Sequence, residues 1–220
     1  MRNRLIVALD VNSFDKAKKL VDKLSPYVNI FKVGSRLFTV CGPKIINYIN
    51  KKRKKTFLDL KFFDIPNTVE GAVRAAAKYG VFMTTLHISG GFDMLKKAAG
   101  ALKGKKKKPL LVGVTVLTSK AGKDIAKEVI KLALIAKKAK LDGVVCSPKE
   151  TRQVKRACGN KFIVVNPGIR PLWAMRGDQR RVTTPEKAIE NGADFIVVGR
   201  PIIKAKYPSL AAQKILEEMV

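Results

Sequence analysis

Histidine, cysteine and tryptophan are scarce in this chain of 220 residues. Its single histidine is His87, and its three cysteines (Cys41, Cys146 and Cys158) have no CxxC spacing. One histidine cannot build a typical zinc site, and it makes a Ser-His-Asp triad a poor candidate. We therefore expect His87 and the cysteines to be structural and expect no metal site. The odd, scattered cysteines favour a reducing compartment.

Long apolar runs are also missing. No run reaches the roughly 18–20 residues that span a bilayer. The first apolar segment, Leu5–Asp10, ends in a charge too early to be the core of a signal peptide. The sequence thus predicts no membrane association and a cytoplasmic location.

Acidic residues are few: 17 Asp and Glu stand against 45 Lys and Arg, a formal charge of +28. Such an excess raises the possibility of a basic protein that binds nucleic acid. However, the lysines are spread along the whole chain, and no aromatic residues alternate with them as a base-stacking surface requires. We favour a solvated basic surface, which would attract an anionic substrate, over a specific nucleic-acid site.

Short apolar runs alternate with amphipathic stretches along the whole chain. The predicted strands are Leu5–Asp10, Asn29–Gly34, Thr56–Lys61, Phe82–His87, Leu110–Leu117, Gly143–Ser147, Phe162–Asn166 and Phe195–Gly199. The predicted helices are Phe14–Leu24, Pro43–Asn50, Thr68–Lys78, Met94–Leu102, Ile125–Ala139, Lys149–Ala157, Pro185–Asn191 and Ser209–Met219. Eight units in strict alternation predict parallel strands with right-handed crossovers.

Eight such units within 220 residues fit one α/β domain, a (β/α)₈ TIM barrel over residues 1–220. An open doubly wound sheet is the alternative. That fold usually has five or six strands and a glycine-rich turn after the first strand, whereas here the first strand runs into Asp10-Val-Asn-Ser-Phe-Asp.

Charged residues occur at the predicted C-terminal ends of three neighbouring strands, where barrels carry their chemistry. They are Asp10, Lys32, Asp59 and Lys61, with Asp64 in the following loop. Because the strand period is two, Asp59 and Lys61 should point to the same face, toward the interior. A structural ion-pair network is the plainer interpretation. Such a cluster in one small domain favours function.

The end of the eighth strand predicts a phosphate site. Gly199 allows close backbone approach, Arg200 offers several donors, and Pro201 suits the first turn of a short helix. Phosphate commonly binds after strands seven and eight of a barrel. The segment after strand seven is unusually long and carries Arg170, Gln179, Arg180 and Arg181. We expect a lid that closes on an anion; an ordinary solvated loop is the alternative.

These strings together resemble the orotidine 5′-monophosphate decarboxylase family over the whole chain. The most specific are Asp59-Leu-Lys-Phe-Phe-Asp-Ile-Pro-Asn-Thr68, Asn166-Pro-Gly-Ile-Arg-Pro171 and Gly177-Asp-Gln-Arg180. Leu9-Asp10, Lys32-Val-Gly34, Val116-Leu-Thr-Ser119, Val145-Cys-Ser-Pro148 and Val198-Gly-Arg-Pro201 also match.

The resemblance implies a reaction, its partners and residue roles. Orotidine 5′-monophosphate would lose CO₂ to give uridine 5′-monophosphate, in pyrimidine biosynthesis, without a cofactor. Lys32, Asp59, Lys61 and Asp64 would form an alternating catalytic tetrad, in which Asp64 comes from the partner subunit of a homodimer and Lys61 protonates C6. The substrate contacts implied are Asp10 and Lys32 at the ribose, Thr68 across the dimer interface, Thr118 at the base, and Arg170, Gln179, Gly199 and Arg200 at the phosphate.

Phe63 departs from the pattern, because many bacterial members carry histidine at this position; we interpret it as a tolerated loop variation. Two other functions stay open. The first is a Mg²⁺-dependent sugar-phosphate aldolase or decarboxylase of the hexulose-phosphate synthase type. Such enzymes resemble this chain in DxKxxD but have a glutamate where this chain has Lys32, which cannot bind Mg²⁺. The second is a basic, non-catalytic nucleic-acid-binding barrel.

Overall fold

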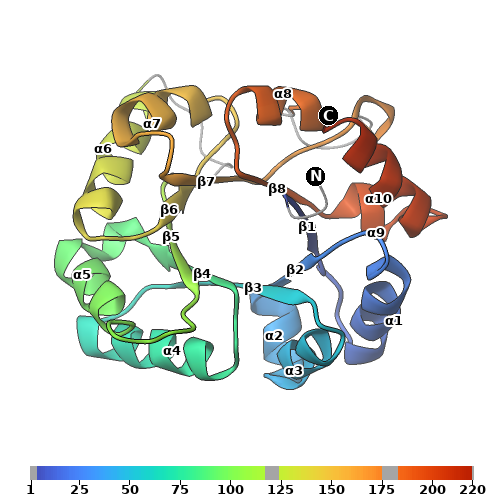
Figure 1. The fold of residues 1–220 in the computed structure, drawn as a ribbon, viewed down its shortest axis with the longest axis horizontal. Helices are drawn as coiled ribbons and strands as arrows, with labels where there is room; N and C mark the ends of the chain where they lie inside the picture. The colour runs from blue at the N-terminus through green and yellow to red at the C-terminus, as the bar shows by residue number, and fades with distance from the viewer. Residues whose placement is uncertain (1–3, 117–123, 175–182, 220) are drawn as a thin grey trace.

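A computed structural model describes residues 4–116, 124–174 and 183–219. Eight parallel strands form a closed barrel in the order β1 to β8, each hydrogen-bonded to the next and β8 to β1 (Figure 1). The strands are β1 (Leu5–Ala8), β2 (Ile30–Gly34), β3 (Lys55–Phe62), β4 (Met83–His87), β5 (Leu110–Val114), β6 (Gly143–Val145), β7 (Ile163–Asn166) and β8 (Phe195–Val198). The predicted barrel is confirmed, and the open sheet is wrong.

Helices surround the barrel (Figure 1). They are α1 (Phe14–Leu24), α2 (Ser35–Cys41), α3 (Lys44–Lys51), α4 (Pro66–Lys78), α5 (Phe92–Gly100), α6 (Ile125–Lys138), α7 (Thr151–Cys158), α8 (Pro185–Glu190), α9 (Arg200–Ile203) and α10 (Pro208–Glu217), with 3₁₀ turns η1 (Ile88–Gly90) and η2 (Leu172–Ala174). The strict one-to-one alternation is wrong at α2, an extra helix before α3. The short helix expected after strand eight is α9.

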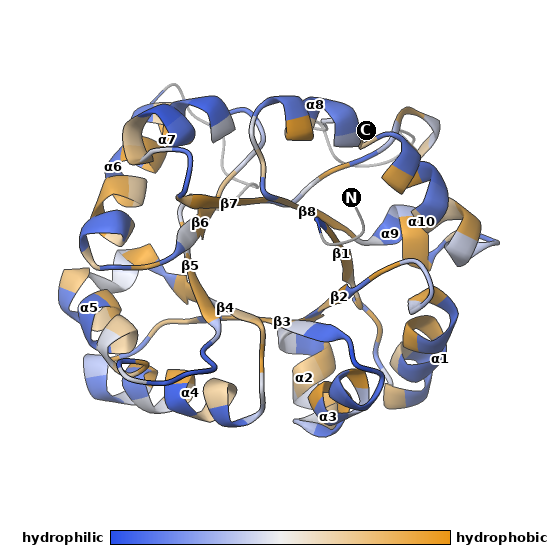
Figure 2. Cartoon of the chain, in the orientation of Figure 1, coloured by the Kyte–Doolittle hydropathy of each residue, from blue (hydrophilic) through white to orange (hydrophobic). Residues whose placement is uncertain are grey.

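Local sequence explains the better predicted boundaries. The α1 helix begins where the Ser13 hydroxyl accepts from the Lys16 N–H at 3.2 Å, and its buried side is Ala17, Val21 and Leu24 at helical spacing. Figure 2 shows the same separation of apolar and polar residues around the barrel: the strands are hydrophobic, and the helices that enclose them are of mixed character. None of the helices in the described ranges is long and apolar enough to cross a membrane.

The barrel interior is filled by one side-chain cluster contributed by most of the strands. Its members are Ile6, Ala8, Ile30, Phe57, Met83, Val112, Val165 and Val197. Two larger clusters lie between the strands and the helices. This interior is therefore a packed core and not a pore.

The longest lysine runs lie at the rim where strands begin. Lys52–Lys54 connect α3 to β3, and Lys105–Lys108 lie between α5 and β5. This rim is opposite to the one where the strands end. Because exposed charges are screened over about 8 Å at physiological ionic strength, these runs contribute little attraction at the far rim. The sequence alone did not distinguish the two rims.

The β3 strand is irregular near its C-terminal end. Leu58 pairs with Thr84 and Phe62 pairs with Leu86, so three residues of β3 face one residue of β4. Within this bulge Lys61 has a φ of 52°, a left-handed conformation that is uncommon for residues other than glycine. The bulge reorients the chain at the point where the charged residues of β3 occur.

Candidate active site

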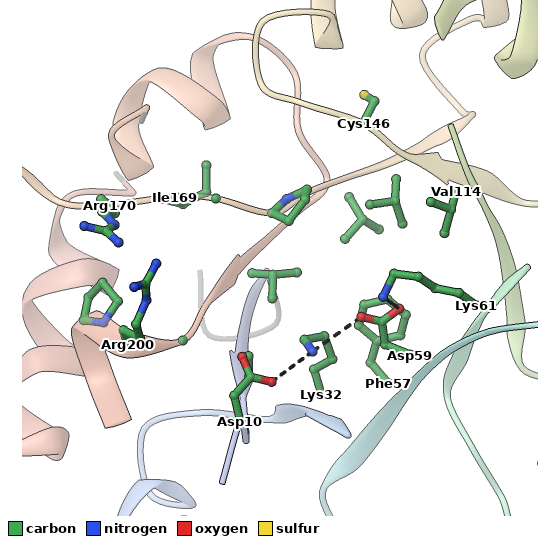
Figure 3. A pocket seen from close by; sticks show the side chains of 18 of the residues that line it. Asp10, Lys32, Phe57, Asp59, Lys61, Val114, Cys146, Ile169, Arg170 and Arg200 are labelled. Atoms are coloured by element: carbon green, nitrogen blue, oxygen red, sulfur yellow. Dashed lines mark hydrogen bonds and ion pairs between the residues drawn. The ribbon is translucent and has the colours of Figure 1, made fainter. Parts of the chain in front are cut away.

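A pocket opens at the rim where the strands end, with a volume of about 290 Å³ (Figure 3). Its charged lining comes from the segment after β1, from β2 and β3, from the segment after β7 and from the start of α9. These charged residues are Asp10, Lys32, Asp59, Lys61, Arg170 and Arg200. Together with Gly199, which also lines it, the pocket brings together seven of the residues that the sequence singled out.

Acidic and basic groups alternate across one side of the pocket (Figure 3). The Lys32 Nζ lies 3.4 Å from Asp10 Oδ1 and 3.4 Å from Asp59 Oδ2. The Lys61 Nζ lies 3.0 Å from Asp59 Oδ1. The side chains of Lys32 and Asp59 are only 12% and 13% exposed, whereas that of Lys61 is 42% exposed. A fixed ion-pair chain thus ends in a lysine that a ligand can reach.

The reason for the Asp59–Lys61 contact differs from the one the sequence suggested. A regular strand would place both side chains on one face by its period of two. Instead, the bulge and the left-handed backbone of Lys61 bring its ammonium back to the Asp59 carboxylate. Both side chains do face the pocket, as predicted, but the strand between them is bulged and not regular.

The pKa of Asp59 reflects two opposing effects. Burial raises the pKa of this carboxyl, but the ammonium groups of Lys32 and Lys61 and hydrogen bonds from Lys61 and Thr85 lower it more. The net pKa of Asp59 lies below its ordinary value. Asp59 is therefore a carboxylate at neutral pH and can hold two neighbouring cations in position.

Two arginines lie on the side of the pocket away from Lys61 (Figure 3). Arg170 follows β7; the residue is 5% exposed, and its backbone N–H donates to the Thr183 carbonyl at 3.0 Å. Arg200 begins α9, directly after Gly199. A β-carbon added at Gly199 would lie 3.4 Å from Asp10 Oδ2, so the backbone here borders the pocket floor. Two guanidinium groups beside open backbone suit a phosphate.

The pocket also has an apolar wall. Val114, Val145, Val165 and Ile169 line it together with the charged residues. Cys146 also lines it, and burial raises the pKa of its thiol to about 12. This thiol stays protonated at neutral pH and is therefore a poor nucleophile. The apolar wall lowers the local dielectric constant and strengthens the electrostatic effect of the ion pairs.

Four expected residues are not in this pocket as described. Asp64 and Thr68 are exposed outside it, and Asp64 Oδ1 accepts from the Ile65 N–H at 2.6 Å. Thr118 lies within residues 117–123 and Gln179 within residues 175–182, both outside the described residues. The lid expected around Arg180 and Arg181 lies outside them as well.

His87 does not line the pocket; its ring contacts Phe63 at a centroid distance of 5.8 Å, and the Ser89 hydroxyl lies 2.7 Å from its Nδ1. No cluster of three metal-binding side chains occurs among residues 4–116, 124–174 and 183–219. Phe63 and His87 thus pack together outside the charged site.

Two further residues, to which the sequence analysis assigned no role, border the ion pairs. A β-carbon at Gly34 would lie 3.2 Å from the Lys32 Nζ, so glycine leaves room for this ammonium. Thr85 bonds to both Asp59 and Lys61. The glycine directly after the Lys32-Val pair was a usable signal, whereas Thr85 is one threonine within an apolar strand and gave none.

Known proteins match the chain along nearly its whole length. A curated relative from Saccharophagus degradans, named orotidine 5′-phosphate decarboxylase, is 47% identical over 98% of this chain and 94% of its own length. A relative of the same name from Geotalea daltonii is 45% identical over 100% of this chain and 97% of its own length.

Solved structures agree. The crystal structure of orotidine 5′-phosphate decarboxylase from Lactobacillus acidophilus superposes with a TM-score of 0.85 at 36% identity, covering 99% of both chains. The model of the orotidine 5′-phosphate decarboxylase / HUMPS family matches residues 3–215. The chain belongs to the orotidine 5′-phosphate decarboxylase / HUMPS family.

Proposed function

We propose that the protein converts orotidine 5′-monophosphate to uridine 5′-monophosphate and CO₂ in pyrimidine synthesis. The observation that carries this proposal is the Lys61 ammonium, held 3.0 Å from Asp59 and backed by Lys32, in a pocket that also contains two arginines. The names of the relatives support the same reaction.

The reaction breaks the bond between C6 of the pyrimidine and its carboxylate carbon. CO₂ leaves, the electron pair stays on C6, and Lys61 transfers an ammonium proton to that carbon. The resulting amine regains its proton from water. A fixed cation beside the developing carbanion stabilises it and also supplies the proton. Asp59 would lie near the departing carboxylate and keep Lys61 charged and oriented.

Binding groups at the other end of the substrate would position the base. Asp10 and Lys32 are assigned to the ribose hydroxyls; Arg170, Gly199 and Arg200 are assigned to the phosphate. Thr118 and Gln179 would contact the base and the phosphate. Binding energy from the phosphate can then be used at the reacting carbon.

We also infer a homodimer with shared sites, in which Asp64 and Thr68 act in the site of the partner. Support comes from the surface around them: Phe63 and Ile65 are 63% and 65% exposed, unusual for side chains this apolar. Mixing Asp59→Asn with Asp64→Asn subunits tests the sharing, because one site of each mixed dimer would be intact. Mixtures no more active than either variant alone would contradict it.

The Mg²⁺-dependent sugar-phosphate reaction fits this pocket less well. The Lys32 ammonium lies between the carboxylates of Asp10 and Asp59, 3.4 Å from each. A magnesium ion bound there would need oxygen ligands at about 2.1 Å and would meet this ammonium. The charge pattern therefore favours a reaction in which lysine supplies the cation.

The basic nucleic-acid-binding alternative predicts tight, salt-sensitive binding. We expect no specific nucleic-acid partner, because the lysines are spread along the whole chain and no aromatic residues alternate with them. The three cysteines are free thiols, which supports a cytoplasmic protein.

The proposed function is tested by mixing the protein with orotidine 5′-monophosphate in EDTA and following the ultraviolet change as the orotate ring becomes uracil. We expect complete conversion, with uridine 5′-monophosphate as product. A folded dimer that leaves the nucleotide unchanged, yet processes a hexulose phosphate when Mg²⁺ is added, would overturn the proposal.

A further inference from the structure

The bulge in β3 leaves a single residue of β4 opposite Asp59, Leu60 and Lys61. That residue is Thr85, whose side chain is fully buried. In a regular ladder each of these positions would have its own partner. The polar groups left without a ladder partner by the bulge need other hydrogen-bond partners, and the Thr85 hydroxyl lies next to them.

The Thr85 hydroxyl bridges the two active-site residues. Its Oγ1 accepts from the backbone N–H of Lys61 at 2.8 Å and donates to Asp59 Oδ1 at 3.0 Å. The direction of both bonds is fixed, because a backbone N–H can only donate and a carboxylate can only accept. One hydroxyl thus determines the backbone position of the lysine and the orientation of the carboxylate.

The same carboxylate oxygen also receives the Lys61 ammonium. Asp59 Oδ1 accepts from the Lys61 Nζ at 3.0 Å, while Oδ2 lies 3.4 Å from the Lys32 Nζ. Rotation of this carboxylate would alter both ion pairs together. The Thr85 bond opposes such rotation from the buried side of the strand, where no solvent can replace it.

We propose that Thr85 is a positioning residue for the decarboxylation, which holds Lys61 in its left-handed backbone conformation and fixes the Asp59 carboxylate against it. The inference deepens the proposed function and rests on it. Thr85 does not line the pocket, so it acts through its two partners and not on the substrate.

Thr84 provides a matched comparison on the same strand. It is also fully buried, and its hydroxyl donates to the Leu58 carbonyl on β3 at 3.0 Å. Both threonines therefore join β4 to β3 through a buried hydroxyl. Only Thr85 bonds to Asp59 and Lys61, so a comparison of the two separates positioning from a general loss of stability.

The experiment compares Thr85→Val, Thr85→Ser and Thr84→Val for kcat, KM and thermal unfolding. We expect Thr85→Val to lower kcat by roughly 10- to 100-fold with little change in KM, since small displacements of reacting groups have effects of this size. Thr85→Ser keeps the hydroxyl and should recover most of kcat. Thr84→Val should lose stability but keep kcat. Thr85→Ala removes the same hydroxyl and replaces Thr85→Val if that variant does not fold.

A titration tests the bridge apart from catalysis. Carbon-13 NMR of the carboxyl groups, with Asp59 assigned from Asp59→Asn, should show a higher Asp59 pKa in Thr85→Val and no change in Thr84→Val. The Asp59 pKa can be measured even if the wild type leaves orotidine 5′-monophosphate unchanged. Failure of the proposed function can therefore be distinguished from failure of the inference about Thr85. Unchanged kcat and Asp59 pKa in Thr85→Val, or an equal loss of kcat in Thr84→Val, would overturn the inference.

Discussion

The Lys61 ammonium and the Asp59 carboxylate lie 3.0 Å apart, although both residues belong to a β-bulge and not to a regular part of β3. The left-handed conformation of Lys61 costs about 1–3 kcal/mol in general. Buried ion pairs also add little net stability once desolvation is counted. The left-handed backbone of Lys61 and the buried ion pairs are therefore explained by the chemistry of Lys61, which is the exposed end of the ion-pair chain.

Replacing Asp59 with Asn should make the free energy of unfolding depend less on pH in the acid range. The native pKa of Asp59 is lowered, so its carboxylate contributes stability above the unfolded pKa of about 3.9 and loses it as pH falls through the native value. The difference in unfolding free energy between wild type and Asp59→Asn should be constant from neutral pH to about pH 5 and shrink below about pH 4. Urea unfolding across pH measures it, with the exposed Asp15→Asn as control. A difference that grows on acidification would contradict the assignment.

Removing Arg200 should weaken binding of the phosphate more than the chemical step. Loss of a charge-assisted hydrogen bond costs about 1.5–3 kcal/mol, which corresponds to a rise in KM of roughly 10- to 100-fold in Arg200→Ala. The phosphate-free nucleoside orotidine should be processed equally by both forms. The exposed Arg156→Ala serves as control. An equal loss with orotidine would show that Arg200 does not act on the phosphate.

Gly34→Ala should displace the Lys32 ammonium, because the new β-carbon would lie 3.2 Å from it and 3.8 Å from Asp10 Oδ1. We expect kcat/KM to fall by about 10-fold, with stability changed by less than about 1 kcal/mol. Gly100→Ala is the matched control, because a β-carbon there meets no atom within 4 Å. Steady-state kinetics and thermal unfolding of both variants measure the effect, and unchanged kinetics in Gly34→Ala would refute the steric argument.

Thr56→Val should leave stability unchanged or raise it by up to about 1 kcal/mol. The Thr56 hydroxyl is buried and has no hydrogen-bond partner within the described part of the chain, so valine of similar shape removes an uncompensated polar group. Thr84→Val removes a bonded hydroxyl and should instead destabilise by about 1 kcal/mol. Thermal unfolding gives both values. The reverse order would mean that Thr56 has a partner, such as a buried water.

Much of the fold could be predicted because apolar periodicity follows directly from the side chains. The α1 boundaries matched at both ends, and the N-terminal one is explained by the Ser13 cap. The first strand was predicted to reach Asp10 but ends at Ala8, since the Val11 N–H donates to the Leu9 carbonyl at 2.9 Å and turns the chain there. Helix α2 was missed because only one of its seven residues, Leu37, is fully buried.

The site was predictable as a set of residue types at strand ends, but its geometry was not. Asp10, Lys32, Asp59 and Lys61 do meet in one pocket. The bulge could not be foreseen, because it depends on pairing between β3 and β4 and not on local sequence. Thr85 was missed for the same reason, since its role exists only where the two strands come together.

In the proposed reaction the Lys61 ammonium both stabilises the developing carbanion at C6 and protonates it. The most direct measurement compares Lys61→Ala with the wild type and with the exposed control Lys131→Ala, in EDTA, by loss of orotidine 5′-monophosphate absorbance. Lys61→Ala should lower turnover by more than about 10⁴-fold, whereas Lys131→Ala should keep near wild-type turnover, with both proteins folded. Turnover by Lys61→Ala within about 10-fold of wild type would show that Lys61 does not have this role.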